Sequence, residues 1–428
     1  MNLLRVALAP GGVLHVGNAR IVLATWLFAR STGGRILLHA ETAARHGEDL
    51  AWLGLDWDGT YDSHDFAARR ADAIARLRSA GRLYPCFESE EELATKQALR
   101  LRRGQPAIYD RAMLKLTPAQ REAAEAGGKA PYWRFRLGEA ELTWQDLILG
   151  RRRVKLLTLS DPVVIRADGT VLQRLAAVID DLALGVSHVL RGEDQIDNTA
   201  IQLDLMAALG ANPGAIALAH LPPLLDAEGT RLSRRIDGLA LRDLRQDGIV
   251  PAALAATLAG ADRPAMPAEL IAGFDLARFA AADRFAMAKL LTINRAALAA
   301  LPFEAIADRL PAGATAAFWH AIRGGIDLLG EARGCWEITN GTIIPPVIED
   351  AGTPLRQALE LLPAEPWRAT VWAEWLAALE AASGRDRAAL DAMLRLALTG
   401  EESGPDLARL LPLIGRGRAA DRLRLAAR

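Results

Sequence analysis

The chain has 428 residues, of which 51% are hydrophobic and 24% are charged, and its formal net charge is −1. This composition is typical of a soluble globular protein and allows two to four domains. The near-neutral charge gives no support to non-specific nucleic-acid binding, so any nucleic-acid partner has to be met by local basic patches.

The two cysteines, Cys86 and Cys335, lie far apart and form no C-x-x-C pair. They favour a reducing compartment and argue against a zinc site or a disulfide framework. The sequence has no signal-peptide pattern and no apolar run of about 18 residues. We therefore expect a cytoplasmic protein with no membrane partner and no metal ligands of its own.

A short apolar run at residues 3–8 is followed by a glycine-rich turn and then by an apolar-periodic run at 21–29. A strand, a glycine turn and a helix N-terminus in this order form an anion-binding corner, because free backbone N–H groups and the helix dipole point at the same place. A glycine turn alone is commonly only a turn. His15 followed by Gly17 at the helix entry is a more specific signal.

Residues 1–84 alternate strand-like and helical patterns, which predicts βαβ units and a parallel sheet. Glu41 follows the strand predicted at 35–39, at the end where open parallel sheets bind ligands. A solvated glutamate after a strand is the simpler interpretation of the pattern alone.

Residues 85–180 resemble an insertion between the two halves of the sheet. Ser89 is a candidate N-cap with acidic residues in the first helical turn. Basic residues follow it at Lys96, Arg100, Arg102, Arg103 and Arg111, and again at 151–153. These residues form either a solvated face or a phosphate-binding surface.

Two basic segments lie in the second half of the predicted sheet. Arg191 ends a strand and precedes Glu193 and Asp194, so from spacing alone it could simply pair with one of these carboxylates. The short basic loop at 229–235 is, from pattern alone, typical of an exposed surface loop. From residue 245 onward, apolar residues recur at spacings of three and four, which predicts amphipathic helices to the end of the chain.

Three of these segments carry a resemblance to the class I aminoacyl-tRNA synthetases. Residues 8–20 resemble the HIGH motif of this class, and in particular the form that the motif takes in the glutamyl-tRNA synthetases. Arg191-Gly-Glu-Asp194 with Asn198-Thr199 is similar to that family's R-G-E-D-H-x-x-N-T signature, and Arg231-Leu-Ser-Arg-Arg235 resembles its K-L-S-K-R loop. The helical C-terminus resembles the anticodon-binding helices of the bacterial glutamyl enzymes.

The resemblance implies a Rossmann-type α/β catalytic domain, with a parallel sheet split by an inserted α/β domain, followed by an all-α C-terminal half. We predict the catalytic domain at 1–84 and 181–240 and the inserted acceptor-stem-binding domain at 85–180. A helical stem-contact region is predicted at 241–300 and a helical anticodon-binding domain at 301–428.

The resemblance also implies a two-step reaction, in which glutamate and ATP form glutamyl-adenylate and tRNA then takes the acyl group. The expected partners are L-glutamate, tRNA(Glu), ATP and Mg²⁺, and the expected state is a monomer. The catalytic positions it implies are His15, Gly17, Arg231, Ser233 and Arg234. It implies ATP binding by His15, Gly17, Asn18 and Arg234, and amino-acid binding by Arg5, Glu41, Gln173 and Arg191.

Several positions depart from the family pattern and keep alternatives open. Ala9 and Gly11 replace a Ser and a Thr of the substrate pocket, Gln173 replaces a Tyr, and arginine replaces both lysines of the K-L-S-K-R loop. The family has an acidic motif, R-I-E-D-T-D, at the end of the strand predicted at 35–39, and of this motif only Glu41 is clearly present here. A divergent second paralogue that binds tRNA without efficient charging, or one that charges tRNA(Gln) with glutamate, is also compatible with the sequence. Queuosine-modifying relatives lack the long helical C-terminus.

Overall fold

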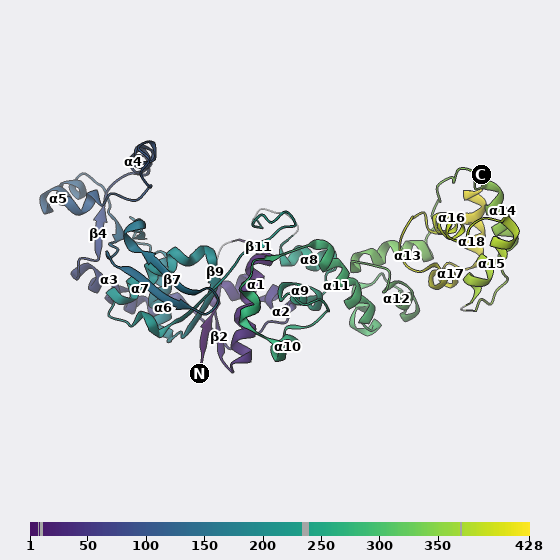
Figure 1. Cartoon of the computed structure of the whole chain (residues 1–428), viewed down its shortest axis with the longest axis horizontal. Coiled ribbons are helices and arrows are strands. Elements are labelled where there is room, and N and C mark those ends of the chain that lie inside the picture. Colours follow the sequence, from purple (N-terminus) through teal and green to yellow (C-terminus); the bar gives the residue numbers. More distant parts are fainter. Residues whose placement is uncertain (7, 9–11, 233–238, 369) are drawn as a thin grey trace. The chain divides into compact units, whose positions relative to one another are not determined.

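The computed structural model describes the whole chain except residues 7, 9–11, 233–238 and 369. Its internal contacts divide the protein into two compact units. The first comprises residues 1–237, 258–260 and 267–285, and the second comprises 238–257, 261–266 and 286–428. Figure 1 labels the elements of both units along the chain.

The first unit is built on a seven-stranded sheet in the order β3-β2-β1-β9-β10-β6-β7. Every neighbouring pair is parallel except β6 and β7, which form an antiparallel hairpin at one edge. The strands are β1 (Leu3–Arg5), β2 (Arg35–His39), β3 (Gly59–Tyr61), β6 (Glu141–Asp146), β7 (Gly150–Lys155), β9 (His188–Gly192) and β10 (Ala217–Leu221). The predicted parallel sheet is confirmed.

The chain leaves β1 in one direction toward β2 and β3, whereas β9 and β10 extend the sheet on the other side. The strand order therefore reverses between β1 and β9, and open α/β sheets bind their ligands at such a switch point, outside the carboxyl ends of the strands. Helix α1 (Val16–Ser31) begins directly beyond β1 and is almost entirely apolar on its buried side. Helix α2 (Ala40–Trp52) begins directly after β2.

The core of this unit lies between one face of the sheet and three helices, α3 (Ala67–Ser79), α6 (Gln173–Leu184) and α7 (Ile196–Ala208). Leu77, Leu175 and Leu205, one from each helix, are fully buried in the same cluster. Burying a leucine side chain contributes roughly 1.5–3 kcal/mol, so these contacts fix α6 and α7 against the strands that they follow and precede.

A second, three-stranded sheet in the order β4-β5-β8 occupies the predicted insertion, with strands β4 (Leu83–Cys86), β5 (Tyr132–Phe135) and β8 (Val163–Ile165). Helices α4 (Glu90–Arg102) and α5 (Pro118–Ala126) lie between β4 and β5 in sequence. The predicted N-cap is confirmed, because Ser89 forms a capping box with Glu92. The hairpin β6–β7, which also lies within 85–180, instead continues the main sheet; the borders of the inserted domain stay a prediction.

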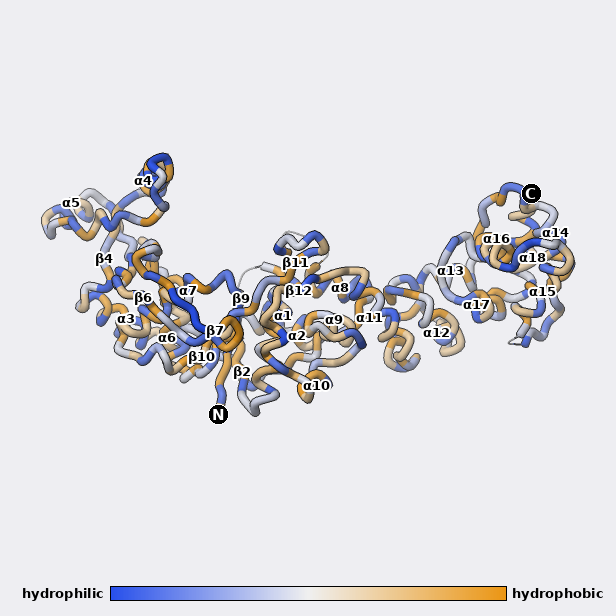
Figure 2. Tube along the Cα trace, in the orientation of Figure 1, coloured by the Kyte–Doolittle hydropathy of each residue, from blue (hydrophilic) through white to orange (hydrophobic). Residues whose placement is uncertain are grey.

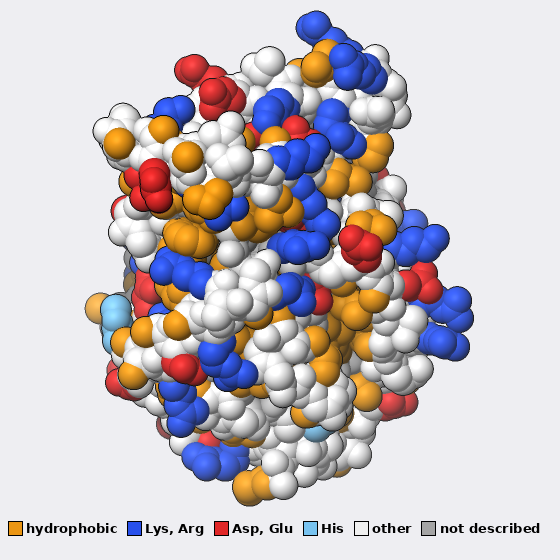
Figure 3. All heavy atoms as spheres, turned by 90° about the vertical axis from the view of Figure 1, so that its left-hand side faces the viewer, with side chains coloured by type: hydrophobic (Ala, Val, Ile, Leu, Met, Phe, Trp, Pro, Cys, Tyr) orange, Lys and Arg blue, Asp and Glu red, His pale blue; other side chains and the backbone are white. Residues whose placement is uncertain are grey.

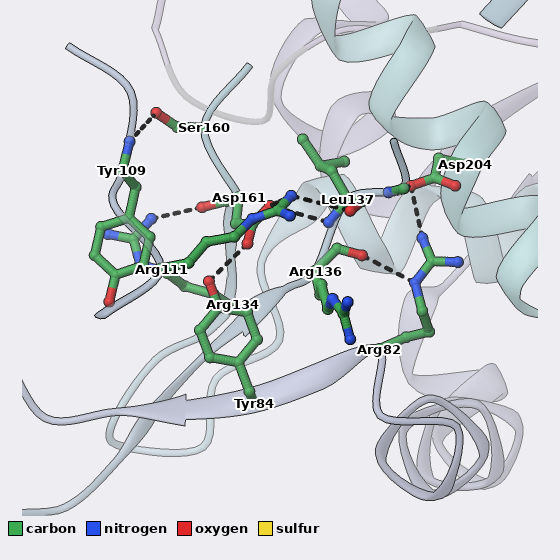
Figure 4. A network of polar contacts seen from close by, with 11 residues as sticks. Arg82, Tyr84, Tyr109, Arg111, Arg134, Arg136, Leu137, Ser160, Asp161 and Asp204 are labelled. Atoms are coloured by element: carbon green, nitrogen blue, oxygen red, sulfur yellow. Dashed lines mark hydrogen bonds and ion pairs between the residues drawn. The ribbon is translucent and has the colours of Figure 1, made fainter. Parts of the chain in front are cut away.

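A buried carboxylate holds the second sheet together. Asp161 accepts hydrogen bonds from the Tyr84 hydroxyl (2.7 Å), the Arg111 guanidinium (2.8 Å) and the Leu137 backbone N–H (3.0 Å), and its own carbonyl accepts from Arg134 (2.6 Å). Figure 4 shows these groups converging on Asp161 from separate segments. A buried charge persists only when its lone pairs are satisfied in this way.

The first unit also contains β11 (Leu224–Leu225) and β12 (Asp283–Arg284), which pair in parallel, and α10 (Pro267–Leu270). The described part of the second unit is helical: α8 (Leu241–Asp247), α9 (Pro251–Leu258), α11 (Met287–Ala300), α12 (Ala316–Ile322), α13 (Ala332–Asn340), α14 (Gly352–Glu360), α15 (Val371–Ser383), α16 (Arg387–Thr399), α17 (Leu407–Ile414) and α18 (Arg416–Ala426). The helical C-terminal half is confirmed. Figure 2 shows apolar and polar residues alternating along these helices, as the three- and four-residue spacings predicted.

Large aromatic side chains fill the core of the second unit. Trp319 and Trp375 are fully buried, and each indole N–H donates to a backbone carbonyl, that of Leu301 and that of Ala358 respectively. Within the ranges that the structure describes, no helix is long and apolar enough to cross a membrane.

Gly248 ends α8 in a left-handed conformation (φ +100°), and an added Cβ would lie 2.5 Å from the backbone nitrogen of Leu329. Gly384 ends α15 with φ +65°, but no atom lies within 4 Å of its Cβ position. We expect Gly384→Ala to cost about 1 kcal/mol of unfolding free energy through φ alone. Gly248→Ala should cost about 3 kcal/mol or more, because the backbone must also move.

Urea denaturation of the two variants beside the wild type measures this difference. Equal losses would show that the contact between Gly248 and Leu329 does not constrain the second unit.

Candidate active site

Two buried arginines lie at the carboxyl edge of the main sheet. Arg5 is the last residue of β1 and Arg191 is the penultimate residue of β9, and their exposed fractions are 6% and 7%. Because β1 and β9 are parallel neighbours, their carboxyl ends meet at the switch point. The structure thus brings two predicted amino-acid-binding residues together.

Arg5 is neutralised by a carboxylate from α6. Its Nε and Nη2 atoms donate to the two oxygens of Asp181, the Nη2 bond being 2.9 Å long. Burial by itself would lower the pKa of Arg5, but the Asp181 carboxylate outweighs it and raises that pKa. The bidentate pair fixes the guanidinium plane and links β1 to α6.

Arg191 has a neutral partner instead. Its Nη1 atom donates to the side-chain oxygen of Gln202 on α7, at 2.7 Å. Burial and the neighbouring charge of Arg5 lower the pKa of Arg191 to about 10, so it is still a cation at neutral pH. The sequence left open an ion pair with Glu193 or Asp194, but the hydrogen bond that orients Arg191 comes from Gln202.

Helix α1 begins with a histidine cap, as the sequence predicts, and its role as an anion-binding corner stays a prediction. His15 is its N-cap, and the His15 ring nitrogen Nδ1 accepts from the Gly17 backbone N–H at 3.2 Å. Asn18 is half-buried in the first turn. The predicted strand and helix are present, the strand being shorter than predicted (Leu3–Arg5), and Gly12 between them has φ +98°. Ala9 and Gly11 lie outside the described residues.

The other predicted amino-acid-binding residues are more exposed. The Glu41 carboxylate lies 3.4 Å from the guanidinium of Arg45, one turn along α2. The backbone N–H of Glu41 donates to the ring nitrogen Nδ1 of His39, the N-cap of that helix. Gln173 is the first residue of α6 and is exposed. Their role in amino-acid binding stays a prediction.

The segment that resembles the K-L-S-K-R loop contacts the same edge of the sheet through Arg231. The guanidinium of Arg231 lies 3.3 Å from the Asp194 carboxylate. Arg231 is 55% exposed in its side chain, so it is accessible to a ligand. Ser233 and Arg234, also predicted to act at the phosphates, lie outside the residues that the structure describes.

A fully buried series of polar contacts connects β6, β10 and α7 at this edge of the sheet. Asp146 at the end of β6 accepts from the His220 ring nitrogen Nδ1 (2.5 Å), and the other ring nitrogen lies 2.6 Å from the Thr199 hydroxyl of α7. The Thr199 hydroxyl also lies 2.9 Å from the Gln195 carbonyl, so the polar contacts run from Asp146 through His220 and Thr199 to the backbone at the start of α7. Burial would raise the pKa of Asp146, but His220 and two backbone N–H groups lower it to about 2.

Asp181, Gln202 and the pair Asp146–His220 were not among the predicted site residues. Two adjacent carboxylates closing the apolar run 176–181 were the only local signal for Asp181. The other three carry no signal in sequence spacing, because their partners come from strands or helices that are distant along the chain.

A split parallel sheet with buried cations at its switch point, a histidine-capped helix N-terminus and a helical C-terminal half define a class I aminoacyl-tRNA synthetase. Residues 3–269 match the family model of the class I tRNA synthetases (E and Q), catalytic domain, and residues 348–427 match an anticodon binding domain. The first match covers more than half of the chain and confirms the class.

Within that class, the chain belongs to the glutamate–tRNA ligase family. It is 50% identical over 441 residues to glutamate–tRNA ligase 2 of Gluconacetobacter diazotrophicus, with 99% of this chain and 100% of that protein covered. It is 51% identical over 438 residues to glutamate–tRNA ligase 2 of Granulibacter bethesdensis, with 98% of each covered. The family predicted from the sequence is confirmed.

Solved structures share the fold at low identity. The chain superposes on a glutamate tRNA ligase from Elizabethkingia meningosepticum, solved in complex with its amino acid, with a TM-score of 0.79 at 22% identity. It superposes on the glutamate-tRNA synthetase from Elizabethkingia anophelis with a TM-score of 0.80 at 22% identity. Both comparisons cover 100% of this chain and 99% of the other.

Asp146→Asn should lower the free energy of unfolding by about 2 kcal/mol at pH 7, since it removes the charge that His220 stabilises. The folded pKa of Asp146 is about 2 and its ordinary value is 3.8, so this stabilisation is complete above pH 4. It is lost as the pH falls from about 4 toward 2, where the wild-type carboxyl is also protonated.

Urea unfolding of both proteins at pH 7, 5, 4 and 3 tests this. The exposed Asp72→Asn is the control and should stay within about 0.5 kcal/mol of the wild type. A deficit of Asp146→Asn that does not shrink below pH 4 contradicts the ion-pair account.

Proposed function

We propose that this protein ligates L-glutamate to tRNA(Glu) in two steps, through a glutamyl-adenylate formed from ATP. The observation that carries the proposal is Arg191, a buried cation with a neutral partner at the switch point, next to the α1 N-terminus. An amino acid presents a carboxylate and ATP presents phosphates, and these are the ligands that the two features attract.

In the first step, the α-carboxylate of glutamate attacks the ATP α-phosphate and pyrophosphate leaves. We assign ATP binding to His15, Gly17, Asn18 and Arg234, because the first turn of α1 offers backbone N–H groups and the positive end of the helix dipole. Arg231, Ser233 and Arg234 provide positive charge and hydrogen bonds at the phosphates, where charge develops in the transition state.

Mg²⁺ enters with ATP. Across the described ranges no group of three His, Cys, Asp or Glu side chains is arranged to hold a metal ion, and Mg²⁺ prefers phosphate oxygens and water as ligands. The residues present fit a Mg²⁺ ion held by the nucleotide, where it neutralises phosphate charge. The protein's own contribution is the placement of the α1 N-terminus and of Arg231.

We assign amino-acid binding to Arg5, Glu41, Gln173 and Arg191. Arg191 holds a substrate carboxylate, because its fork of N–H donors suits bidentate contact and its hydrogen-bond partner among the described residues is neutral. Neither step requires a protein nucleophile, so positioning and countercharge carry the catalysis. The replaced pocket residues, Gln173 among them, therefore act on affinity and orientation more than on bond-breaking.

We assign tRNA binding to the three domains predicted from the sequence. These are the acceptor-stem-binding domain at 85–180, the stem-contact region at 241–300 and the anticodon-binding domain at 301–428. Figure 3 looks onto the first unit from the side of α3, α4 and α5, and Lys and Arg side chains form a broken band from the top to the bottom of this face. On β7, Arg151, Arg153 and Lys155 alternate outward and are exposed. Clustered cations of this kind bind nucleic-acid phosphates. We propose further that the protein acts as a cytoplasmic monomer.

The direct test is aminoacylation of total tRNA with labelled L-glutamate and ATP, followed by purified tRNA(Glu) and tRNA(Gln). We expect glutamyl-tRNA to accumulate with tRNA(Glu). Arg191→Ala should lower kcat/KM for glutamate by roughly 10²- to 10⁴-fold, because it removes a buried charge-assisted contact. Arg191→Lys keeps the charge without the planar fork, so its kcat/KM for glutamate should lie between the values of the wild type and of Arg191→Ala.

If tRNA binds while no glutamyl-tRNA forms at high enzyme concentration, the protein is a tRNA-binding paralogue. Charging of tRNA(Gln) alone would instead identify the paralogue that places glutamate on tRNA(Gln).

Replacing Arg151 and Arg153 by glutamate should weaken tRNA binding without changing the KM for glutamate. Each lost phosphate contact reduces the slope of log Kd against log salt by about 0.7 to 0.9, so the double variant should lose roughly 1.5. The control is Arg35→Glu, an exposed arginine at the amino end of β2, which is next to the edge strand β3 and far from β7 in the strand order.

Filter-binding titrations from 50 to 300 mM salt would measure both variants. An unchanged slope in the double variant would show that β7 faces solvent in the complex.

A further inference from the structure

Arg191 is oriented by a neutral group and not by an ion pair. Four other arginines of the first unit, Arg5, Arg70, Arg82 and Arg111, pair with a carboxylate. Arg20, Arg134 and Arg174 donate to neutral carbonyl or amide oxygens, as Arg191 does. Arg191 is about as buried as Arg5, yet its side-chain partner is the neutral amide of Gln202 at 2.7 Å. Its Nε atom has no hydrogen-bond partner among the described residues.

Gln202 is held in place by the helix that carries it. It is only 7% exposed and lies in the middle of α7. One turn before it, Thr199 contacts His220 of β10 at 2.6 Å, and two residues after it Asp204 accepts from Arg82 at 2.6 Å and from the Gly138 N–H at 2.9 Å. These contacts fix α7 on both sides of Gln202, so the amide oxygen is presented to Arg191 in one orientation.

A neutral acceptor does two things that a carboxylate cannot do together. It orients the guanidinium by a hydrogen bond, and it adds no negative charge of its own, so that Asp181, Asp146 and Asp194 attract the poorly solvated Arg191 without a hydrogen bond to it among the described residues. A ligand carboxylate that reaches Arg191 then provides a hydrogen-bonded counter-charge and gains strongly from the low local dielectric. A carboxylate at position 202 would satisfy that charge permanently.

We propose that Gln202 is a positioning residue that sets the affinity for the amino-acid substrate, by orienting Arg191 while leaving its charge for the substrate carboxylate. The inference rests on the proposed function, since it takes the ligand of Arg191 to be the carboxylate of an amino acid.

The experiment compares Gln202→Glu and Gln202→Met with the wild-type full-length enzyme. Gln202→Glu keeps the shape and adds the charge, and it should raise the KM for glutamate by roughly 10- to 100-fold with kcat within about threefold. Gln202→Met keeps the length but removes the acceptor, and it should raise that KM by about 3- to 10-fold. The KM for ATP should stay within about twofold in both variants.

Asp58→Asn is the matched control, because it disturbs an arginine contact of the first unit, that with Arg30, which takes no part in holding α7 or Arg191. It should change the melting temperature but not the KM for glutamate. The melting temperature of Gln202→Glu should equal or exceed that of the wild type, since a glutamate there can pair with Arg191. A role in packing alone predicts the opposite: lower melting temperatures for both Gln202 variants and an unchanged KM.

Calorimetric titration with L-glutamate separates this inference from the proposed function. Wild-type protein that binds glutamate but does not charge tRNA would refute the proposed ligation and leave Gln202 to be judged from Kd in place of KM. A wild-type KM or Kd in Gln202→Glu overturns the inference, whatever the charging activity. If the wild type binds no glutamate at all, both fail.

Discussion

The bidentate pair between Arg5 and Asp181 is the interaction on which the rest of the site depends. Two guanidinium groups at the ends of adjacent strands repel each other, and burying either one without a partner costs several kcal/mol. Asp181 neutralises one of them, and the pKa directions reflect this: that of Arg5 is raised and that of Arg191 is lowered. The sheet can therefore hold one available positive charge at its switch point because the neighbouring charge is already matched.

Helix α7 is the second structural constraint, since it joins three strands by polar contacts that water cannot reach. Thr199 connects it to His220 of β10 and through His220 to Asp146 of β6, while Gln202 connects it to Arg191 of β9. Asp146, His220, Thr199 and Gln202 each have a hydrogen-bond partner in this network, which is the condition under which buried polar groups rigidify a core. The hairpin β6–β7 thus belongs to the same scaffold as Arg191, although it precedes β9 in sequence by the whole of β8 and α6.

The chemistry of a glutamate–tRNA ligase suits such a scaffold. In the proposed two-step reaction, adenylate formation and acyl transfer occur between the substrates themselves, so the protein has to supply fixed donors and charges and does not need a nucleophile. A family member can then have arginine in place of the two lysines of the K-L-S-K-R loop and retain the charge. The cost is geometric, because a planar guanidinium presents its donors in a fixed fork and an ammonium does not.

The sequence by itself determined the features that are encoded in contiguous stretches. The strand, turn and helix around His15, the cap at Ser89, the strand that ends near Arg191 and the helical C-terminal half follow from local periodicity, capping residues and short motifs, and the family follows from the order of those motifs. Only the tertiary structure decided the partners: Asp181 for Arg5, 176 residues away, Gln202 for Arg191, and Asp146 for His220. Such pairs depend on which strands become neighbours and on which helix face is buried, and the free energy that selects them belongs to the packed core as a whole.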